Sequence, residues 1–221
     1  MTPPAAFVFD AYGTLFDVHS AAQKYAADLG DDWERLSEIW RTKQLEYTWV
    51  LAAAGQHDTF WAITERALDF AIAVVRADVS TDLRTALLGA YRSLEAYDDV
   101  GDVLSELRAG GAKTLILSNG DVDLLDEAVK AAGLDGLFDA VLSVEPVGVF
   151  KPSMAVYQSA CAATGLHAHQ ISFQSSNRWD IAGAHIFGFR TVWINRTGRP
   201  DEYPAQPPDR VLSNLRGLTE I

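Results

Sequence analysis

The fold is decided by residues 7–16, which read Phe-Val-Phe-Asp-Ala-Tyr-Gly-Thr-Leu-Phe. A short apolar run ends at the carboxylate of Asp10, and a Gly-Thr turn follows at once. A buried parallel strand delivers a charged side chain to the carboxyl edge of its sheet in this way, and open α/β sheets bind ligands at that edge. A strand that simply ends at a solvated Asp explains the stretch equally well, so the rest of the chain must decide.

Regular alternation of helices and strands begins near Asp98 and continues to a Pro-rich loop at residues 200–208. An additional short edge strand is expected near Val211. Such alternation predicts βαβ units and a doubly wound parallel sheet with both faces covered, so the fold class is α/β. Beyond the first strand, the main strands are predicted at residues 113–117, 140–144, 171–174 and 191–194.

The stretch between the first strand and this alternation has helical periodicity throughout. Four helices are predicted here, and Ser20 with Gln23 resembles a capping box at the start of the first. An insertion of this kind predicts a bundle that covers the sheet edge, with residues 17–95 as a cap domain and residues 1–16 and 96–221 as the core domain. The apolar residues of the third helix recur at Phe60, Ile63, Ala67, Phe70 and Val74.

Composition excludes several classes of function. A net charge of −12 argues against a nucleic-acid or anionic-membrane partner, for which basic patches are expected. No segment has the length of a membrane span, and the start of the chain lacks the pattern of a signal peptide. Cys161, the single cysteine, is expected to be a small buried apolar residue in a reducing compartment. These features predict a cytoplasmic protein.

Small polar residues stand where the predicted strands end. Each has an ordinary explanation in turn or capping chemistry, and Lys151 alone would be a solvated lysine. Their joint placement around one sheet edge nevertheless predicts a functional site. The candidates are Asp10, Thr14, Ser118, Asn119, Lys151, Ser175, Asn177 and Asp180.

Four segments, residues 10–17, 118–120, 151–152 and 175–180, resemble the four motifs of the haloacid dehalogenase superfamily in order and spacing. Residues 40–49, Trp-Arg-Thr-Lys-Gln-Leu-Glu-Tyr-Thr-Trp, further resemble the L-2-haloacid dehalogenases. The resemblance implies a Rossmann-like core with an inserted four-helix-bundle cap. It also implies hydrolysis of small L-2-haloalkanoic acids to D-2-hydroxy acids, with a halide ion as the second product.

Tyr12 separates the chain from the phosphatases of this superfamily, whose first motif resembles Asp-x-Asp. The second carboxylate there protonates the leaving group, whereas a halide needs no proton. Asp10 and Asp180 remain as the carboxylates, and two of them beside Lys151 make a poor Mg²⁺ site. No metal and no cofactor are therefore expected.

The resemblance implies that Asp10 attacks C2 of the substrate, with inversion, to form an aspartyl ester. Lys151 would keep Asp10 ionised, because a nearby positive charge favours a carboxylate, and Thr14 would orient it. Ser118 and Asn119 are suited to binding the substrate carboxylate.

Arg41 would reach down from the cap to accept the halide, while Ser175, Asn177 and Asp180 would position or activate the hydrolytic water. Thr42 stands where related enzymes often have Gln, which affects the shape of the halide pocket. Arg178 is expected to be a solvated flank of the last motif. The remaining substrate contacts are expected from Ala11, Tyr12, Leu45, Phe60 and Trp179.

Two alternatives stay open. One is a phosphatase or another small-molecule hydrolase on the same scaffold, and the other is a non-catalytic protein that binds a small carboxylate. Apolar surface on the inserted helices offers a face for pairing, and the resemblance implies a homodimer.

Overall fold

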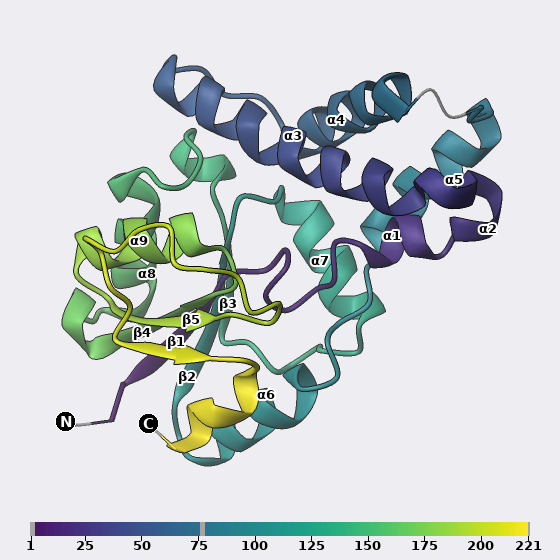
Figure 1. Cartoon of the computed structure of the whole chain (residues 1–221). Coiled ribbons are helices and arrows are strands. Elements are labelled where there is room, and N and C mark those ends of the chain that lie inside the picture. The colour runs from purple at the N-terminus through teal and green to yellow at the C-terminus, as the bar shows by residue number, and fades with distance from the viewer. Residues whose placement is uncertain (1–2, 76–77, 221) are drawn as a thin grey trace.

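The computed structural model describes residues 3–75 and 78–220. Its centre is a six-stranded sheet with the order β3-β2-β1-β4-β5-β6, in which every neighbouring pair is parallel (Figure 1). The predicted strands and the edge strand near Val211 are confirmed. The strands are β1 (Ala6–Phe9), β2 (Lys113–Ser118), β3 (Ala140–Ser143), β4 (Ile171–Ser175), β5 (Arg190–Ile194) and β6 (Arg210–Leu212).

Strand β1 is the central strand, and all four of its residues are buried. It pairs with β2 on one side and β4 on the other. Strands β2 and β3 extend the sheet on the first side, and strands β4, β5 and β6 extend it on the second. The gap between β1 and β4 is therefore the topological switch point, where parallel sheets of this kind bind ligands. Asp10 follows β1 directly, and Ser175 ends β4.

Helices cover both faces of the sheet (Figure 1). Helices α8 and α9 lie on one face, whereas α6 packs with the C-terminal 3₁₀ segment η4 (Leu215–Glu220) on the other. Gly165 and Gly188 end α8 and α9 with positive φ angles of 71° and 102°, as helix C-caps require. The core helices are α6 (Val100–Ala109), α7 (Val122–Ala131), α8 (Met154–Thr164) and α9 (Arg178–Phe187).

The inserted helices lie above the carboxyl edge of the sheet, with α3 packed along α4 and α1 against α3 and α5 (Figure 1). The expected capping box is wrong: the Ser20 hydroxyl donates to the Asp17 carbonyl at 2.8 Å, and the first helix breaks after Gln23. Phe70 and Val74 face outward and are about 40% exposed. The elements are α1 (Ser20–Gln23), α2 (Ala26–Leu29), a 3₁₀ turn (Gly30–Asp32), α3 (Trp33–Ala53), α4 (Phe60–Val75) and α5 (Thr81–Arg92).

Asp121 fastens the inserted helices to the core. Its buried carboxylate accepts the backbone N–H groups of Phe60 at 2.9 Å and Trp61 at 2.8 Å, which open α4. These are N–H groups that a helix cannot satisfy internally, so a core loop caps a helix of the insertion. On the same side, Arg92 at the end of α5 forms an ion pair with Glu127 on α7 at 2.6 Å.

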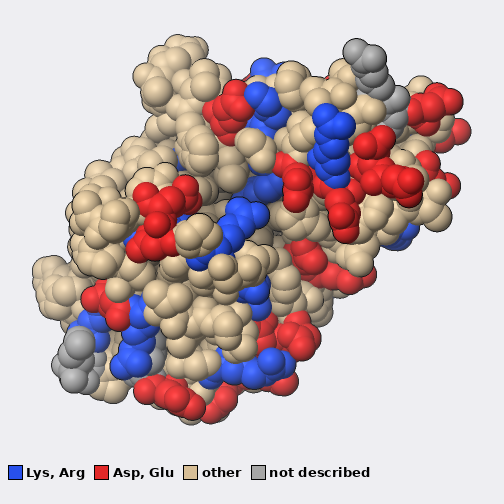
Figure 2. Space-filling view, in the orientation of Figure 1, with Lys and Arg blue, Asp and Glu red and all other residues tan. Residues whose placement is uncertain are grey.

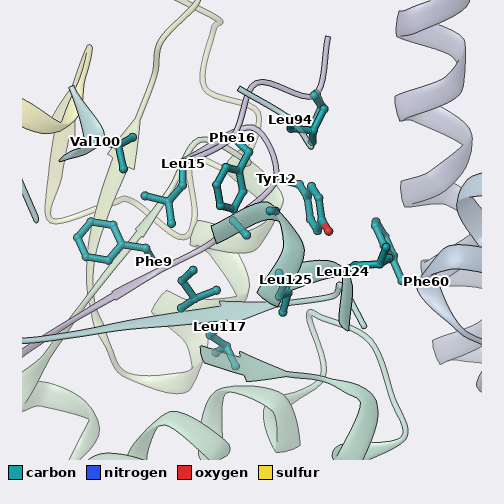
Figure 3. Close-up of a cluster of buried hydrophobic side chains, with 14 of the residues drawn as sticks. Phe9, Tyr12, Leu15, Phe16, Phe60, Leu94, Val100, Leu117, Leu124 and Leu125 are labelled. Atoms are coloured by element: carbon teal, nitrogen blue, oxygen red, sulfur yellow. The ribbon is translucent and has the colours of Figure 1, made fainter. Parts of the chain in front are cut away.

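Aromatic packing around Tyr12 joins the core to the inserted helices (Figure 3). The Tyr12 ring stacks on Phe60 and Tyr91, with ring centroids 5.2 and 5.7 Å apart. A Cβ atom at Gly120 would lie 2.8 Å from the Tyr12 ring, so the close approach of this loop depends on glycine. The loop that follows β1 is thus held from both the core and the inserted helices.

Two expectations from composition can be compared with the structure. Cys161 is half-buried rather than buried, although it packs against the core. Within residues 3–75 and 78–220, no helix has both the length and the apolar character to cross a membrane.

Candidate active site

The site is centred on a buried triad of charges. The Lys151 ammonium lies 3.0 Å from Oδ1 of Asp10 and 2.9 Å from Oδ2 of Asp180. Lys151 and Asp180 are fully buried, and Asp10 is 6% exposed. Burial by itself lowers the pKa of Lys151, but the two carboxylates outweigh it and raise that pKa above its ordinary value. The lysine is therefore a permanent cation at neutral pH.

The second oxygen of Asp10 is held by uncharged donors. Oδ2 accepts hydrogen bonds from the Thr14 hydroxyl at 2.9 Å, the Asn177 amide at 2.8 Å and the Ser175 hydroxyl at 3.3 Å. A carboxylate oxygen offers about two lone-pair directions, so Oδ2 is saturated. Oδ1 contacts the Lys151 ammonium and keeps a lone pair with which to attack an electrophile.

Local backbone geometry sets this orientation. Gly13 has a φ of 89°, which turns the chain sharply after β1, and the N–H groups of Thr14 and Leu15 return to the Ala11 carbonyl. The Thr14 hydroxyl also accepts the N–H of Ser176 at 2.8 Å. The loops that follow β1 and β4 are thus tied together beside the carboxylate of Asp10.

Asp180 has other partners than the sequence predicted. Its Oδ2 contacts Lys151 and its Oδ1 accepts the Tyr157 hydroxyl at 2.7 Å, whereas Ser175 and Asn177 point to Asp10. Burial raises the pKa of Asp180 to about 6, against the opposing effect of Lys151. Sequence reasoning missed Tyr157, because a tyrosine on the buried face of a helix looks like an ordinary core residue.

The loop after β2 lies on the other side of the site. Ser118 and Asn119 are buried there, and the Ser118 hydroxyl oxygen accepts the Gly120 N–H at 3.1 Å. Oδ1 of Asn119 accepts a hydrogen bond from the backbone N–H of Lys151 at 2.9 Å, which links the loop after β2 to the lysine. The serine hydroxyl still has its proton to donate to a ligand.

Arg41 reaches the site from α3. Its guanidinium donates to the Tyr12 carbonyl at 3.0 Å and to Oδ1 of Asn177 at 3.4 Å. The four large apolar side chains that were predicted to contact the substrate lie in two different parts of the structure. Leu45 and Trp179 line an open cavity beside Arg41, whereas Tyr12 and Phe60 belong to the closed aromatic stack.

Arg178 is not the solvated flank that the sequence suggested. It is 4% exposed, and its Nε forms an ion pair with Asp201 at 2.7 Å. Its Nη2 donates to the carbonyls of Tyr203 and Gln206 at 2.6 and 2.8 Å. Arg178 therefore anchors the Pro-rich loop at residues 200–208 to the segment 175–180.

No cluster of three or more His, Cys, Asp or Glu side chains with the geometry of a metal site occurs in the part of the chain that the structure describes. The ammonium of Lys151 stands between the two carboxylates of the site. Divalent-cation ligation would have to compete with that ion pair.

A buried aspartate whose Oδ1 contacts a lysine, at the switch point of a parallel sheet, has the position and the charge that a hydrolase with a carboxylate nucleophile requires. The chain matches the haloacid dehalogenase-like hydrolase family over residues 4–188. It is 44% identical to (S)-2-haloacid dehalogenase 1 of Pseudomonas sp. strain CBS-3 over 221 residues, which cover the whole chain and 97% of that protein. It is 42% identical to (S)-2-haloacid dehalogenase 4A of Burkholderia cepacia, with 96% and 92% covered.

Among solved structures, the chain resembles the L-2-haloacid dehalogenase of Xanthobacter autotrophicus with chloropropionic acid covalently bound. The TM-score is 0.89 at 34% identity, with 98% of this chain and 97% of that chain covered. The chain therefore belongs to the haloacid dehalogenase-like hydrolase family.

Proposed function

We propose that the protein hydrolyses small L-2-haloalkanoic acids to D-2-hydroxy acids and halide. One observation carries the proposal: Asp10 is buried, three uncharged donors hold its Oδ2, and among the described residues Lys151 alone donates to its Oδ1, with the aromatic ring of Tyr12 where a phosphatase has its acid. The (S)-2-haloacid dehalogenases that the chain matches along its whole length support the same reaction.

In the first step, Oδ1 of Asp10 attacks C2 from the side opposite the halogen. The new C–O bond forms as the carbon–halogen bond breaks, which inverts C2 and releases the halide with its electron pair. Ser118 and Asn119 bind the substrate carboxylate, and Arg41 receives the halide. A site closed to water strengthens each of these charge interactions.

In the second step, water attacks the carbonyl carbon of the Asp10 ester. The bond from that carbon to the alkoxy oxygen breaks, so the 2-hydroxy acid carries an oxygen from Asp10 and the carboxylate gains one from water. Asp180 accepts one proton of the attacking water in this proposal and returns it to the departing alkoxide, while the other water proton is released to solvent as Asp10 becomes a carboxylate again. Lys151 and Tyr157 hold the Asp180 carboxylate in place.

Access to this site requires motion of the inserted helices, because Asp10 is almost completely covered. Residues 17–95 would act as a cap domain over a core of residues 1–16 and 96–221. Hydrogen exchange in α3 and α4 that slows when a substrate analogue binds would support this division, and equal exchange in both states would oppose it.

The reaction is tested by halide release from enantiopure L-2-chloropropionate after exhaustive EDTA treatment. We expect full activity on the L enantiomer, little on the D enantiomer, and no gain on adding Mg²⁺. Phosphate-ester hydrolysis that appears only with Mg²⁺ would favour the phosphatase alternative. Binding of a 2-haloacid without any turnover would favour the binding protein.

Asp180 has a testable pH signature. Because burial raises its pKa to about 6, the ionised base is present above that pH, and kcat should fall as the pH drops through about 6.

In Asp180→Asn, ester hydrolysis should slow more than ester formation, so the covalent adduct should accumulate in mass spectra. The exposed Asp126→Asn on α7 is the control. Loss of the initial halide burst without an adduct would show that Asp180 serves the first step instead.

The homodimer and the cytoplasmic location remain proposals. Exposed Phe70 and Val74 border a hollow of about 400 Å³ between α3 and α4 and supply the apolar part of a face that a second copy could cover. Light scattering should give twice the chain mass of 24.1 kDa, and Phe70→Ser should lower it. A single-chain mass for the unaltered protein would contradict pairing.

The proposed cytoplasmic location is supported by the lone Cys161, which cannot form an internal disulfide. Fractionation of producing cells tests this location.

A further inference from the structure

Basic side chains gather where the inserted helices meet the core (Figure 2). Arg196, in the loop that follows β5, belongs to this region, because it lines the same open cavity as Arg41. Its side chain is 13% exposed, and Nη2 of its guanidinium donates to the backbone carbonyl of Thr14 at 2.9 Å. A charged group of the core thus contacts the loop that begins at Asp10.

Thr14 links that contact to the carboxylate of Asp10. Its hydroxyl donates to Oδ2 of Asp10 at 2.9 Å and accepts the N–H of Ser176 at 2.8 Å. Thr14 is fully buried, so its carbonyl has no access to water and depends on a donor from the protein. Arg196 supplies that donor. The arginine therefore fixes the backbone that bears the orienting hydroxyl.

Arg196 is itself held in one orientation. Its Nη1 and Nη2 atoms each lie 3.0 Å from an oxygen of Asp99, a two-point contact that fixes the plane of the guanidinium. The centroid of the Tyr97 ring lies 4.0 Å from Cζ of the arginine. Asp99 is fully buried, and its Oδ2 also accepts the N–H of Leu215 at 2.6 Å. The donor to the Thr14 carbonyl is therefore in place before any substrate binds.

Other contacts fix the rest of the loop after β1. The N–H of Tyr97 donates to the Leu15 carbonyl at 3.0 Å, and the N–H of Asp17 donates to the Glu95 carbonyl at 2.8 Å. These bonds join backbone to backbone, so they do not depend on the arginine side chain. Loss of the Arg196 guanidinium should therefore leave the loop folded and release Thr14 in particular.

We propose that Arg196, oriented by Asp99, is a positioning residue for the attack by Asp10. It fixes the Thr14 backbone, so that the Thr14 hydroxyl holds Oδ2 of Asp10 and leaves Oδ1 aimed at the substrate carbon. Arg196 acts through Thr14 and is not itself a reacting group. Its effect on the attack rests on the proposed function, whereas the link from Arg196 to Thr14 does not.

The role is tested with Arg196→Met in single-turnover halide release from L-2-chloropropionate. The maximal rate of the first turnover should fall about 10- to 100-fold, because misplacing a reacting group by up to about 1 Å has effects of this size. The substrate concentration that gives half of this rate should change less than about twofold, because substrate binding is untouched. Arg196→Lys keeps a cation that can donate to the Thr14 carbonyl and should recover part of the rate.

Arg216→Met is the matched control. It removes an exposed arginine that pairs with Asp98, the neighbour of Asp99, at 3.4 Å, and it should change neither value. Arg196→Met leaves the buried Asp99 carboxylate unpaired. If that variant does not fold, the double variant Arg196→Met/Asp99→Asn, which removes both charges of the pair, takes its place.

A double-mutant cycle separates positioning from general damage. Adding Arg196→Met to Thr14→Val should slow the first turnover by less than about twofold beyond Thr14→Val alone, because the hydroxyl through which Arg196 acts is already gone. Losses that multiply in the double variant would overturn the role. It would also be overturned by a first-turnover rate of Arg196→Met equal to that of Arg216→Met.

Hydrogen exchange gives a readout that needs no turnover. The Ser176 N–H bonds to the Thr14 hydroxyl, so it should exchange faster in Arg196→Met than in Arg216→Met. Equal exchange in the two variants would overturn the link between Arg196 and Thr14. If the unaltered protein releases no halide, the proposed function fails, and the exchange rates alone then support or overturn this link.

Discussion

Asp10→Asn is expected to reduce halide release from L-2-chloropropionate by about 10⁴-fold or more, as loss of a covalent nucleophile does in other hydrolases. The amide keeps the shape of the side chain but has no anionic oxygen to attack C2. Stopped-flow or endpoint halide assays measure the loss, and no covalent adduct should form on the protein.

The stability of Asp10→Asn should not fall with its activity. The buried triad carries two carboxylates and one ammonium, so removing the charge of Asp10 leaves a balanced Lys151–Asp180 pair. The melting temperature of Asp10→Asn should therefore be equal to or above that of the unaltered protein. Asp17→Asn, in the same loop, is the matched control and should retain turnover. Substantial halide release by a verified Asp10→Ala protein would refute the nucleophile assignment.

Lys151→Met should be damaging to both activity and stability. It leaves two buried carboxylates without their shared cation, and breaking a buried ion pair in this way costs about 3–5 kcal/mol of unfolding free energy. Halide release should fall about 10³-fold or more, because the anionic nucleophile would face an anionic substrate without the ammonium that contacts both carboxylates.

The pH dependence of the Lys151→Met stability follows from Asp180. Its pKa, already raised by burial, should rise further once the opposing ammonium is gone. The neutral acid then favours the folded state, so the stability deficit should shrink as the pH falls below the raised pKa and grow as the pH rises through it. Denaturant unfolding at several pH values measures this trend, with the exposed Lys130→Met as control. A deficit independent of pH would contradict the account.

Sequence reasoning succeeded where the signal is local or periodic. Strand ends are such a signal: an apolar run followed by a polar turn fixed the positions of Asp10, Ser118 and Ser175, and the structure brings these loops to one sheet edge. The start of α5 carries a local signal of the same kind, because the Ser80 hydroxyl oxygen accepts the Leu83 N–H and caps the helix.

Contacts between distant segments were not predictable. Arg178 looked solvated because its partners, the Asp201 carboxylate and the backbone carbonyls of residues 203 and 206, all lie far along the chain in a loop. Asp121 stands where it would cap its own helix, yet it caps α4 from the core. Phe70 continues a helical apolar spacing that turns out to face outward. Periodicity identifies a stripe but not the surface that covers it.

The central claim is that Asp10, not water, forms the bond to C2. A single turnover in water enriched in ¹⁸O, with enzyme in excess over L-2-chloropropionate, tests it most directly. The account predicts an unlabelled 2-hydroxy acid, because its oxygen comes from Asp10, and one ¹⁸O in the peptide that contains Asp10. Label in the product of the first turnover, with none in that peptide, would contradict it.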